Sequence, residues 1–222
     1  MYNQAKQKDS RSTMLQDKSK KVLVLFAHPS LHRSEINRHL KRQSERFDSV
    51  TLVDLYAEYP DYHIDIDKEQ RRLVEHDVIV FMFPLYWYST PSILKEWQDL
   101  VLEYGFAYGQ DGTALHGKRF LSVISAGGAS DAYKTEGYNH FTVRQLLQPL
   151  EQTASLTGMT YLPPLVLFSA RKARNDGRLS KHIKVWKHAL EMLTNDELPI
   201  NDVKDLNNLN LYMEPIVEEL DK

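Results

Sequence analysis

Four segments of the chain are continuous runs of apolar residues, and more polar stretches separate them. They are Val22–Ala27, Val78–Phe83, Phe120–Ser125 and Leu165–Phe168, while Val50–Leu55 is a weaker run of the same kind. Uninterrupted apolar runs of this length are typical of parallel strands that are covered on both faces. We therefore predict four buried strands, with Val50–Leu55 as an edge strand.

Segments with helical spacing of apolar residues lie between and after these runs. They are Glu35–Phe47, Lys68–His76, Ser92–Tyr104, Phe141–Leu156 (with a kink expected at Pro149) and Arg178–Leu193. Strands that alternate with helices form parallel sheets through right-handed crossovers. The pattern predicts an α/β protein: a flavodoxin-like, doubly wound, five-stranded parallel sheet with helices on both faces.

The two ends of the chain differ from this pattern. Residues 1–20 are polar and contain no apolar core of a secretory signal, so we expect a disordered tail there. The flavodoxin-like domain would then occupy residues 21–194, and residues 195–222 would form an acidic, solvated tail. In the alternative, its apolar residues dock on the body or on a partner chain: Leu209, Leu211, Met213, Ile216 and Val217.

Charge and composition narrow the function classes. The 222 residues carry 28 basic and 30 acidic side chains, a formal net charge of −2, which predicts no electrostatic binding of nucleic acid. The absence of cysteine excludes disulfides, iron–sulfur clusters and a cysteine nucleophile, and it is compatible with a reducing cytoplasm. No histidine cluster has the spacing of a metal site. The longest apolar stretch, Val78–Tyr88, is too short to span a bilayer.

Ligands of open α/β sheets bind beyond the carboxyl ends of the strands, so the loops there are candidate sites. The first is AHPSLHRSEIN, in which Ser34 is placed to cap a helix beginning near Glu35. A helix N-terminus with a hydroxyl can bind an anion, and His28 could add a donor. The other reading is a capped helix with a histidine in a turn.

Two further loops follow the next buried strands. PLYWYSTP, residues 84–91, has aromatic faces and backbone amides that could hold a planar heterocycle, or its rings could pack a dimer interface or cap the core. SAGGASDAY, residues 125–133, has a glycine pair that allows close backbone approach to a ligand, or it is a plain turn. Three such loops on successive strand ends favour a ligand over either simple reading.

Several motifs bear a family resemblance that covers roughly Lys21–Leu193. They are AHPSLHRSEIN, FPLYWYSTPSILKEWQDLVLEYGFAYG, GTALHGK, SAGGASDAY and LLQPLEQTASLTGM. On these motifs the chain resembles the flavodoxin-like NAD(P)H:quinone oxidoreductases. Within them it is most similar to the ancillary proteins of bacterial glutathione-regulated potassium-efflux systems.

The resemblance implies a bound flavin with NAD(P)H as co-substrate. FMN is favoured over FAD because contacts for the extra nucleotide of FAD are not evident in the sequence. The implied cofactor residues are, at the phosphate end, His28, Ser34 and Asn37; along the ring, Pro84, Leu85, Tyr86, Trp87 and Tyr88; and at its polar edge, Ser125, Gly127 and Gly128. The implied catalytic residues are Tyr133 and His140. His140 lies one position beyond the family's histidine, which is Asn139 here.

The activity implied by the resemblance is two-electron, ping-pong transfer of hydride from NAD(P)H through the flavin to quinones or similar electrophiles. A homodimer is implied too, with Tyr104, Phe106 and Tyr108 as exposed dimer surface. The alternative is a regulatory subunit that binds a potassium-efflux transporter at the inner face of the cell membrane. A single-electron carrier of flavodoxin type is a third reading, which the mild charge and the wide aromatic loop disfavour.

Overall fold

The computed structural model describes residues 19–222. The predicted N-terminal tail therefore falls, except for its last two residues, outside the described residues. In the described part of the chain, five parallel strands form one sheet in the order β2-β1-β3-β4-β5. The strands are β1 (Val22–Phe26), β2 (Val50–Asp54), β3 (Val78–Pro84), β4 (Arg119–Ser125) and β5 (Thr160–Leu167). The predicted fold class is confirmed.

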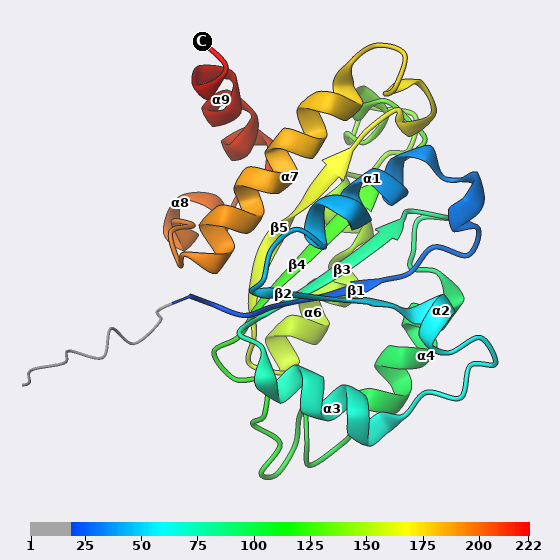
Figure 1. Cartoon of the computed structure of the whole chain (residues 1–222), viewed down its shortest axis with the longest axis vertical. Coiled ribbons are helices and arrows are strands. Elements are labelled where there is room, and N and C mark those ends of the chain that lie inside the picture. The colour runs from blue at the N-terminus through cyan, green and yellow to red at the C-terminus, as the bar shows by residue number, and fades with distance from the viewer. Residues whose placement is uncertain (1–18) are drawn as a thin grey trace, which may run out of the picture.

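Helices cover both faces of this sheet (Figure 1). One face carries α1 (Glu35–Ser44) and α7 (Arg178–Thr194), and the other carries α3 (Ile66–Glu75), α4 (Ser92–Val101) and α6 (Gln148–Leu156). The shorter elements are α2 (Leu55–Glu58), α5 (Val143–Leu146), α8 (Ile200–Val203) and the 3-10 turns η1 (Leu31–Arg33), η2 (Ser130–Ala132) and η3 (Ala170–Lys172). Helix α9 (Asn210–Leu220) ends the chain. Within residues 19–222, no helix combines the length and apolar character needed to cross a membrane.

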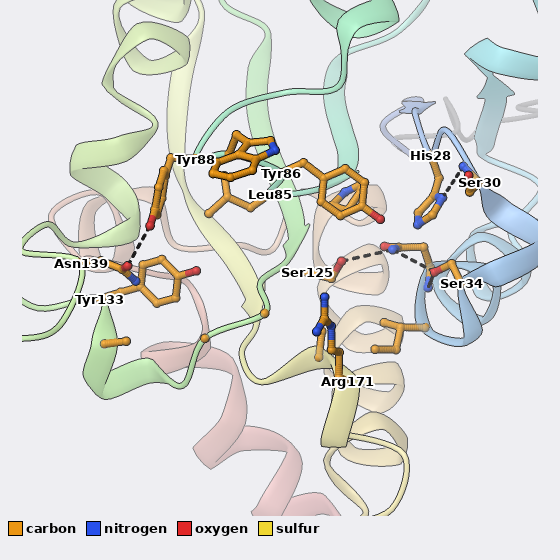
Figure 2. A pocket seen from close by; sticks show the side chains of 18 of the residues that line it. His28, Ser30, Ser34, Leu85, Tyr86, Tyr88, Ser125, Tyr133, Asn139 and Arg171 are labelled. Atoms are coloured by element: carbon orange, nitrogen blue, oxygen red, sulfur yellow. Dashed lines mark hydrogen bonds between the residues drawn. The ribbon is translucent and has the colours of Figure 1, made fainter.

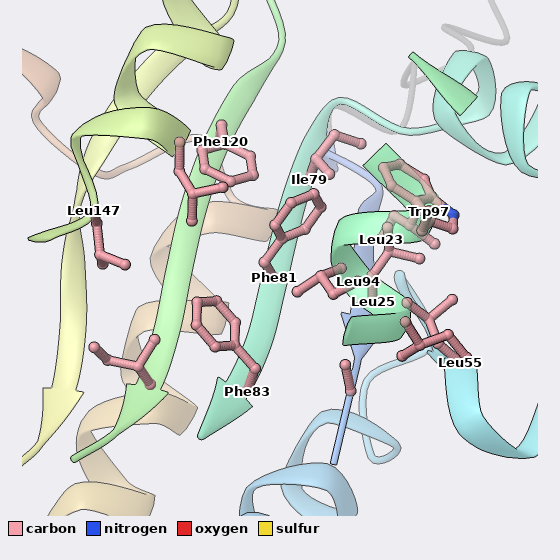
Figure 3. Packing of buried hydrophobic residues seen from close by; sticks show 14 of the residues in the cluster. Leu23, Leu25, Leu55, Ile79, Phe81, Phe83, Leu94, Trp97, Phe120 and Leu147 are labelled. Carbon is pink, nitrogen blue, oxygen red and sulfur yellow. The ribbon is translucent and has the colours of Figure 1, made fainter. Parts of the chain in front are cut away.

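The strands bury both faces because their alternate residues enter two separate cores. Leu23 and Leu25 of β1 pack with Phe81 of β3 and Trp97 of α4 on one face (Figure 3). Val22, Val24 and Phe26 enter the other core, where α7 contributes Trp186. The continuous apolar runs seen in the sequence follow from this two-sided burial.

The order in which successive strands are added to the sheet reverses between β1 and β3. Strand β1 pairs with β2 on one side and with β3 on the other, and β4 and β5 follow on the side of β3. A crevice forms at such a switch point, outside the carboxyl ends of the strands. The fold thus brings the loops after β1, β3, β4 and β5 to one edge of the sheet.

Two predicted elements differ from the structure. Strand β5 begins at Thr160 instead of Leu165, and it includes Pro163 and Pro164, which the predicted strand left out. Proline is tolerated there since β5 is an edge strand, and the pairing with β4 shifts register between Leu121 and Val123. The predicted helix Phe141–Leu156 is divided into α5 and α6, with Pro149 in the first turn of α6.

The prediction of a solvated C-terminal tail is wrong, and its alternative, docking on the body, is what the structure has. Leu209, Met213 and Val217 are buried in the core that α7 also lines. Lys181 of α7 forms ion pairs with two carboxylates of α9, at 3.1 Å to Glu214 and 2.6 Å to Glu218. The spacing of apolar residues in this segment outweighs its acidic composition.

Candidate functional site

A cavity of about 1000 Å³ lies at the carboxyl edge of the sheet (Figure 2). Twelve of the thirteen residues that the sequence singled out line it: His28, Ser34, Asn37, Pro84, Leu85, Tyr86, Trp87, Tyr88, Ser125, Gly127, Gly128 and Tyr133. They come from the loops after β1, β3 and β4. Their gathering follows from the parallel sheet, in which these loops share one edge.

The loop after β1 forms a cluster of hydroxyl and amide groups around Asn37. Ser34 caps α1: its Oγ accepts hydrogen bonds from the backbone N–H and from Nδ2 of Asn37, both at 3.2 Å. Asn37 Nδ2 also donates to Ser125 Oγ at 3.1 Å, which joins this loop to the end of β4. Both serine oxygens act as acceptors here, so their hydroxyl hydrogens are available to a ligand.

Asn37 itself has an unused acceptor. Its side chain is buried, and Oδ1 has no hydrogen-bond partner within the described residues. A buried polar atom without a partner costs free energy, so a ligand hydroxyl or amide that donated to it would be stabilised. The first turn of α1 adds backbone N–H groups without intrahelical acceptors, those of Glu35 and Ile36.

His28 is a neutral donor in this site. Burial lowers its pKa below the ordinary 6.5, so the ring is uncharged at neutral pH. Its Nδ1 accepts the backbone N–H of Ser30 at 3.1 Å, which places the remaining proton on Nε2. The ring also meets Tyr86 edge to face, with centroids 6.1 Å apart. His28 can therefore donate one hydrogen bond but brings no positive charge.

The aromatic loop after β3 is a tight turn with left-handed backbone. Tyr86 accepts the N–H of Ser89 at 3.1 Å, and the two residues between them, Trp87 and Tyr88, have φ of 50° and 63°. Two successive positive φ values are typical of a type I′ turn, where Asn and Gly are usual. The Trp87 side chain is 93% exposed, so the turn holds a large aromatic face in the open. Strain of this kind is found at functional sites.

The glycine loop after β4 forms the opposite part of the wall. A Cβ at Gly127 would meet no atom within 4 Å, whereas one at Gly128 would come to 3.2 Å from Tyr133. Tyr133 is buried against Phe168, and burial raises the pKa of its hydroxyl above 10, so it stays protonated at neutral pH. The site thus has a phenol donor beside a glycine backbone that a ligand can approach closely.

A fourth loop, after β5, also lines the cavity and was missed by the sequence reasoning. It contributes Ala170, Arg171 and Arg174. The basic run SARKARNDGR after the last strand was the signal available in the sequence. Other lining residues that were not predicted are Ser30, Ile36, Ala132, Tyr138 and Asn139.

His140 is the one candidate that does not line the cavity. It is exposed with φ of 61°, while its neighbour Asn139 lines the wall and accepts a hydrogen bond from the Tyr88 hydroxyl at 3.1 Å. Asn139 thereby links the aromatic turn to the segment after η2. The geometry gives His140 no contact with the cavity, so we do not retain it as a catalytic candidate.

The aromatic residues expected at a dimer surface are not equally exposed. Tyr104 is 66% exposed, but Phe106 and Tyr108 are partly buried against the core. The expectation of three exposed rings is therefore wrong for two of them. Both follow α4 in a loop that folds back on the body, with Gly105 N–H donating to the Tyr108 carbonyl at 2.8 Å.

Comparison with known proteins agrees with the fold and the motifs. A family model described as a flavodoxin-like fold matches residues 20–190. The glutathione-regulated potassium-efflux system ancillary protein KefG of Serratia proteamaculans is 49% identical over 154 residues, which cover 69% of this chain and 84% of that protein.

Two solved structures are similar over their whole length. General stress protein 14 of Treponema denticola, in complex with FMN, is 33% identical with a TM-score of 0.74, covering 78% of this chain and 99% of that one. An NADPH-quinone reductase of P. pentosaceus is 32% identical with a TM-score of 0.70, covering 77% and 97%. With a family match over most of its length and these relatives, the chain belongs to the family of the flavodoxin-like fold.

Proposed function

We propose that the protein is a flavin-dependent NAD(P)H:quinone oxidoreductase that holds FMN in the cavity at the carboxyl edge of the sheet. The observation that carries this proposal is the division of the cavity. Unused hydroxyl and backbone N–H donors and one unused amide acceptor lie at the β1 loop, and an aromatic turn faces a glycine loop beside it. FMN has the same division into a polar phosphate chain and a flat ring.

The residues at the β1 loop fit the phosphate chain. The hydroxyl hydrogen of Ser34 and the first N–H groups of α1 suit phosphate oxygens. Asn37 Oδ1, the buried acceptor without a partner, suits a hydroxyl of the ribityl chain. The Nε2–H of His28 is a further neutral donor.

The loops after β3 and β4 fit the ring. Leu85, Tyr86, Trp87 and Tyr88 would lie along it, and the open space over Gly127 would let the backbone approach its polar edge. The similarity to an FMN complex of a family member supports the same choice of cofactor. Bound there, FMN would supply two-electron hydride chemistry.

The chain's own residues would orient the two substrates in turn. The exposed Trp87 face and the rim residue Tyr138 would bind the nicotinamide, and after its release the quinone would occupy the same place. The Tyr133 hydroxyl, protonated at neutral pH, would donate a hydrogen bond where negative charge develops. One place used by two substrates implies ping-pong kinetics.

Steady-state kinetics test the proposal. The protein, saturated with FMN, is assayed for oxidation of NADPH and NADH at several concentrations of a benzoquinone. We expect turnover with parallel double-reciprocal lines. A rate of NAD(P)H oxidation no higher than that of free FMN would contradict the proposed enzymatic activity. Intersecting lines would contradict the proposal that both substrates bind at one site.

We further propose a symmetric homodimer that completes the substrate pocket. Tyr104, Tyr138 and Phe141, which are 66%, 87% and 53% exposed, are aromatic side chains that suit such an interface. Light scattering at micromolar concentration should give twice the 25.9 kDa chain mass. A monomer would contradict this part of the proposal.

A second function is favoured by one observation, the 49% identity with KefG of Serratia proteamaculans, an ancillary protein of a potassium-efflux system. In this reading the protein binds a transporter and modulates it, with or without turnover. Co-purification with a potassium-efflux transporter from the source membrane would support it. Potassium efflux that does not respond to the added protein would contradict it.

A further inference from the structure

We infer that Arg171 supplies the positive charge that binds a phosphate monoester in this cavity. The inference rests on the proposed function, because the phosphate belongs either to the flavin or to the 2′ position of NADPH. It begins from the electrostatics of the wall. Among the described residues that line the cavity there are two arginines, Arg171 and Arg174, and neither aspartate nor glutamate.

The donors predicted for a phosphate are all uncharged. Ser34 offers a hydroxyl, α1 offers backbone N–H groups, and His28 is neutral because burial lowers its pKa. A phosphate monoester carries about −1.5 to −2 charges at pH 7. Neutral donors alone leave that charge uncompensated in a partly enclosed site, where the local dielectric is below that of water.

The backbone beneath Arg171 is held in place by several bonds. Ala170 N–H donates to the carbonyl of Ala126 at 2.9 Å, and Ser169 N–H donates to that of Gly128 at 2.7 Å. These bonds tie η3 directly to the glycine loop. Ala173, two residues on, is fully buried and anchors the turn from below. These contacts fix the backbone from which the Arg171 side chain extends, so ligand binding has to order only the side chain.

The neighbouring Arg178 has a structural role. It donates to the carbonyls of Phe168 and Ser169 and pairs with Asp176 at 2.6 Å, so it stabilises the loop. The Arg171 guanidinium, in contrast, makes no hydrogen bond or ion pair within residues 19–222. Figure 2 shows it pointing from the end of β5 toward Ser125. Its planar fork of donors suits two phosphate oxygens at once.

The test compares Arg171→Gln with Lys172→Gln. Lys172 is exposed and does not line the cavity, so Lys172→Gln removes the same charge one residue away from Arg171. Dissociation constants are measured by fluorescence for FMN and riboflavin, and by calorimetry for NADP⁺ and NAD⁺ on the FMN-loaded protein. Arg171→Lys, which keeps the charge but loses the fork, should give an intermediate value.

Selective loss of the phosphorylated ligand supports the inference. If the phosphate is that of the flavin, Arg171→Gln should weaken the binding of FMN about 10- to 100-fold and leave the binding of riboflavin unchanged. If it is the 2′-phosphate, the binding of NADP⁺ should weaken by a similar factor, while the binding of NAD⁺ and of both flavins should not change. In either case Lys172→Gln should match the wild type.

Two results would overturn this inference and leave the proposed function standing. The first is that the wild-type protein binds FMN and that the Arg171→Gln variant binds all four ligands as tightly as the wild type does. The other is equal weakening of FMN and riboflavin, which would mean a loss of shape and not of a phosphate contact. A wild-type protein that binds neither flavin would overturn the proposed function and the inference with it.

Discussion

At the scale of single residues, the turn from Tyr86 to Ser89 is the most informative feature. Trp87 and Tyr88 hold positive φ values that cost bulky side chains about 1–2 kcal/mol each. Trp87 gains little in return from burial, since its side chain is 93% exposed. The proposed flavin ring gives this arrangement a purpose, because the turn presents flat aromatic surface to the cavity.

Replacement of Trp87 by Asn should therefore separate stability from binding. Asparagine tolerates positive φ, so we expect the free energy of unfolding to rise by about 0.5–1 kcal/mol while FMN affinity falls. Urea denaturation and a flavin titration measure the two quantities. The control is Tyr138→Asn, since Tyr138 is 87% exposed but has no positive φ. A variant that is less stable than the wild type would refute the strain argument.

Tyr133→Phe tests the phenol donor. If the hydroxyl donates one hydrogen bond in the transition state, its loss should cost roughly 1–3 kcal/mol, about 10- to 100-fold in rate. The rate of NAD(P)H oxidation by the FMN-loaded protein measures this. Tyr212→Phe, in α9 and not among the residues that line the cavity, should leave the rate nearly unchanged. An unchanged rate in Tyr133→Phe would remove this residue from the mechanism.

His182 makes stability depend on pH. It is buried in α7, its Nε2 has no hydrogen-bond partner within residues 19–222, and burial lowers its pKa from 6.5 to about 4, against the opposing effect of Glu214. Between these pH values the unfolded chain binds a proton that the folded chain does not, so stability falls as the pH drops from 6.5 towards 4.

The variant His182→Leu should show a shallower decline of the unfolding free energy over that interval, measured by urea denaturation at several pH values. Some decline remains, because burial also lowers the pKa of His28 and of His76. His39→Leu, at an exposed position, is the control. A decline as steep as that of the wild type would contradict this assignment.

How far the site could be predicted depends on the loop. Residues on the first three loops were found because aromatic residues are unusual in turns, and because the capping serine and the glycine pair lie in loops that follow predicted strands, where ligands bind. Arg171 was missed because an arginine after a strand is common at a surface, and its direction depends on bonds between η3 and the glycine loop. The position of His140 outside the cavity could not be predicted either, because no local motif specifies the positive φ at this residue.

At the scale of elements, the C-terminal segment covers the free edge of β5. The Asn210 side chain accepts the N–H of Val166 at 2.8 Å and donates to its carbonyl at 3.0 Å, and Leu209 N–H donates to the Pro164 carbonyl at 2.9 Å. An uncovered strand edge invites pairing with other chains. The family match ends at residue 190, so this cover lies beyond it.

Asn210→Ala should destabilise the protein by about 1–3 kcal/mol, because two buried backbone groups of Val166 lose their partners. Thermal denaturation and light scattering measure the loss of stability and any association through the exposed edge. Asn207→Ala, three residues earlier and exposed, is the matched control. Equal stability of the two variants would show that Asn210 does not protect the edge.

The strands that were predicted most accurately are those that the sheet buries on both faces. Strands β1, β3 and β4 were read from continuous apolar runs to within one residue at each end. Strand β5 was cut short because a proline pair usually ends a strand, and only its edge position makes the pair acceptable. The docking of α9 could not be read from local composition, since it depends on the surface that α7 offers.

At the scale of the whole molecule, the doubly wound sheet explains why residues up to 146 positions apart form one cavity, from His28 to Arg174. Parallel strands place their following loops at one edge, and the reversal between β1 and β3 opens a crevice there. We propose that this cavity holds a flavin that exchanges electrons with a nicotinamide and a quinone.

The visible spectrum of the purified protein tests that claim most directly. FMN is added in the dark and unbound flavin is removed, then NADPH or NADH is added without oxygen, and finally a benzoquinone. We expect a band near ~450 nm that bleaches with the nucleotide and returns with the quinone, since this change belongs to the cofactor. A protein that retains no flavin, or a bound flavin that neither nucleotide reduces, would contradict the account.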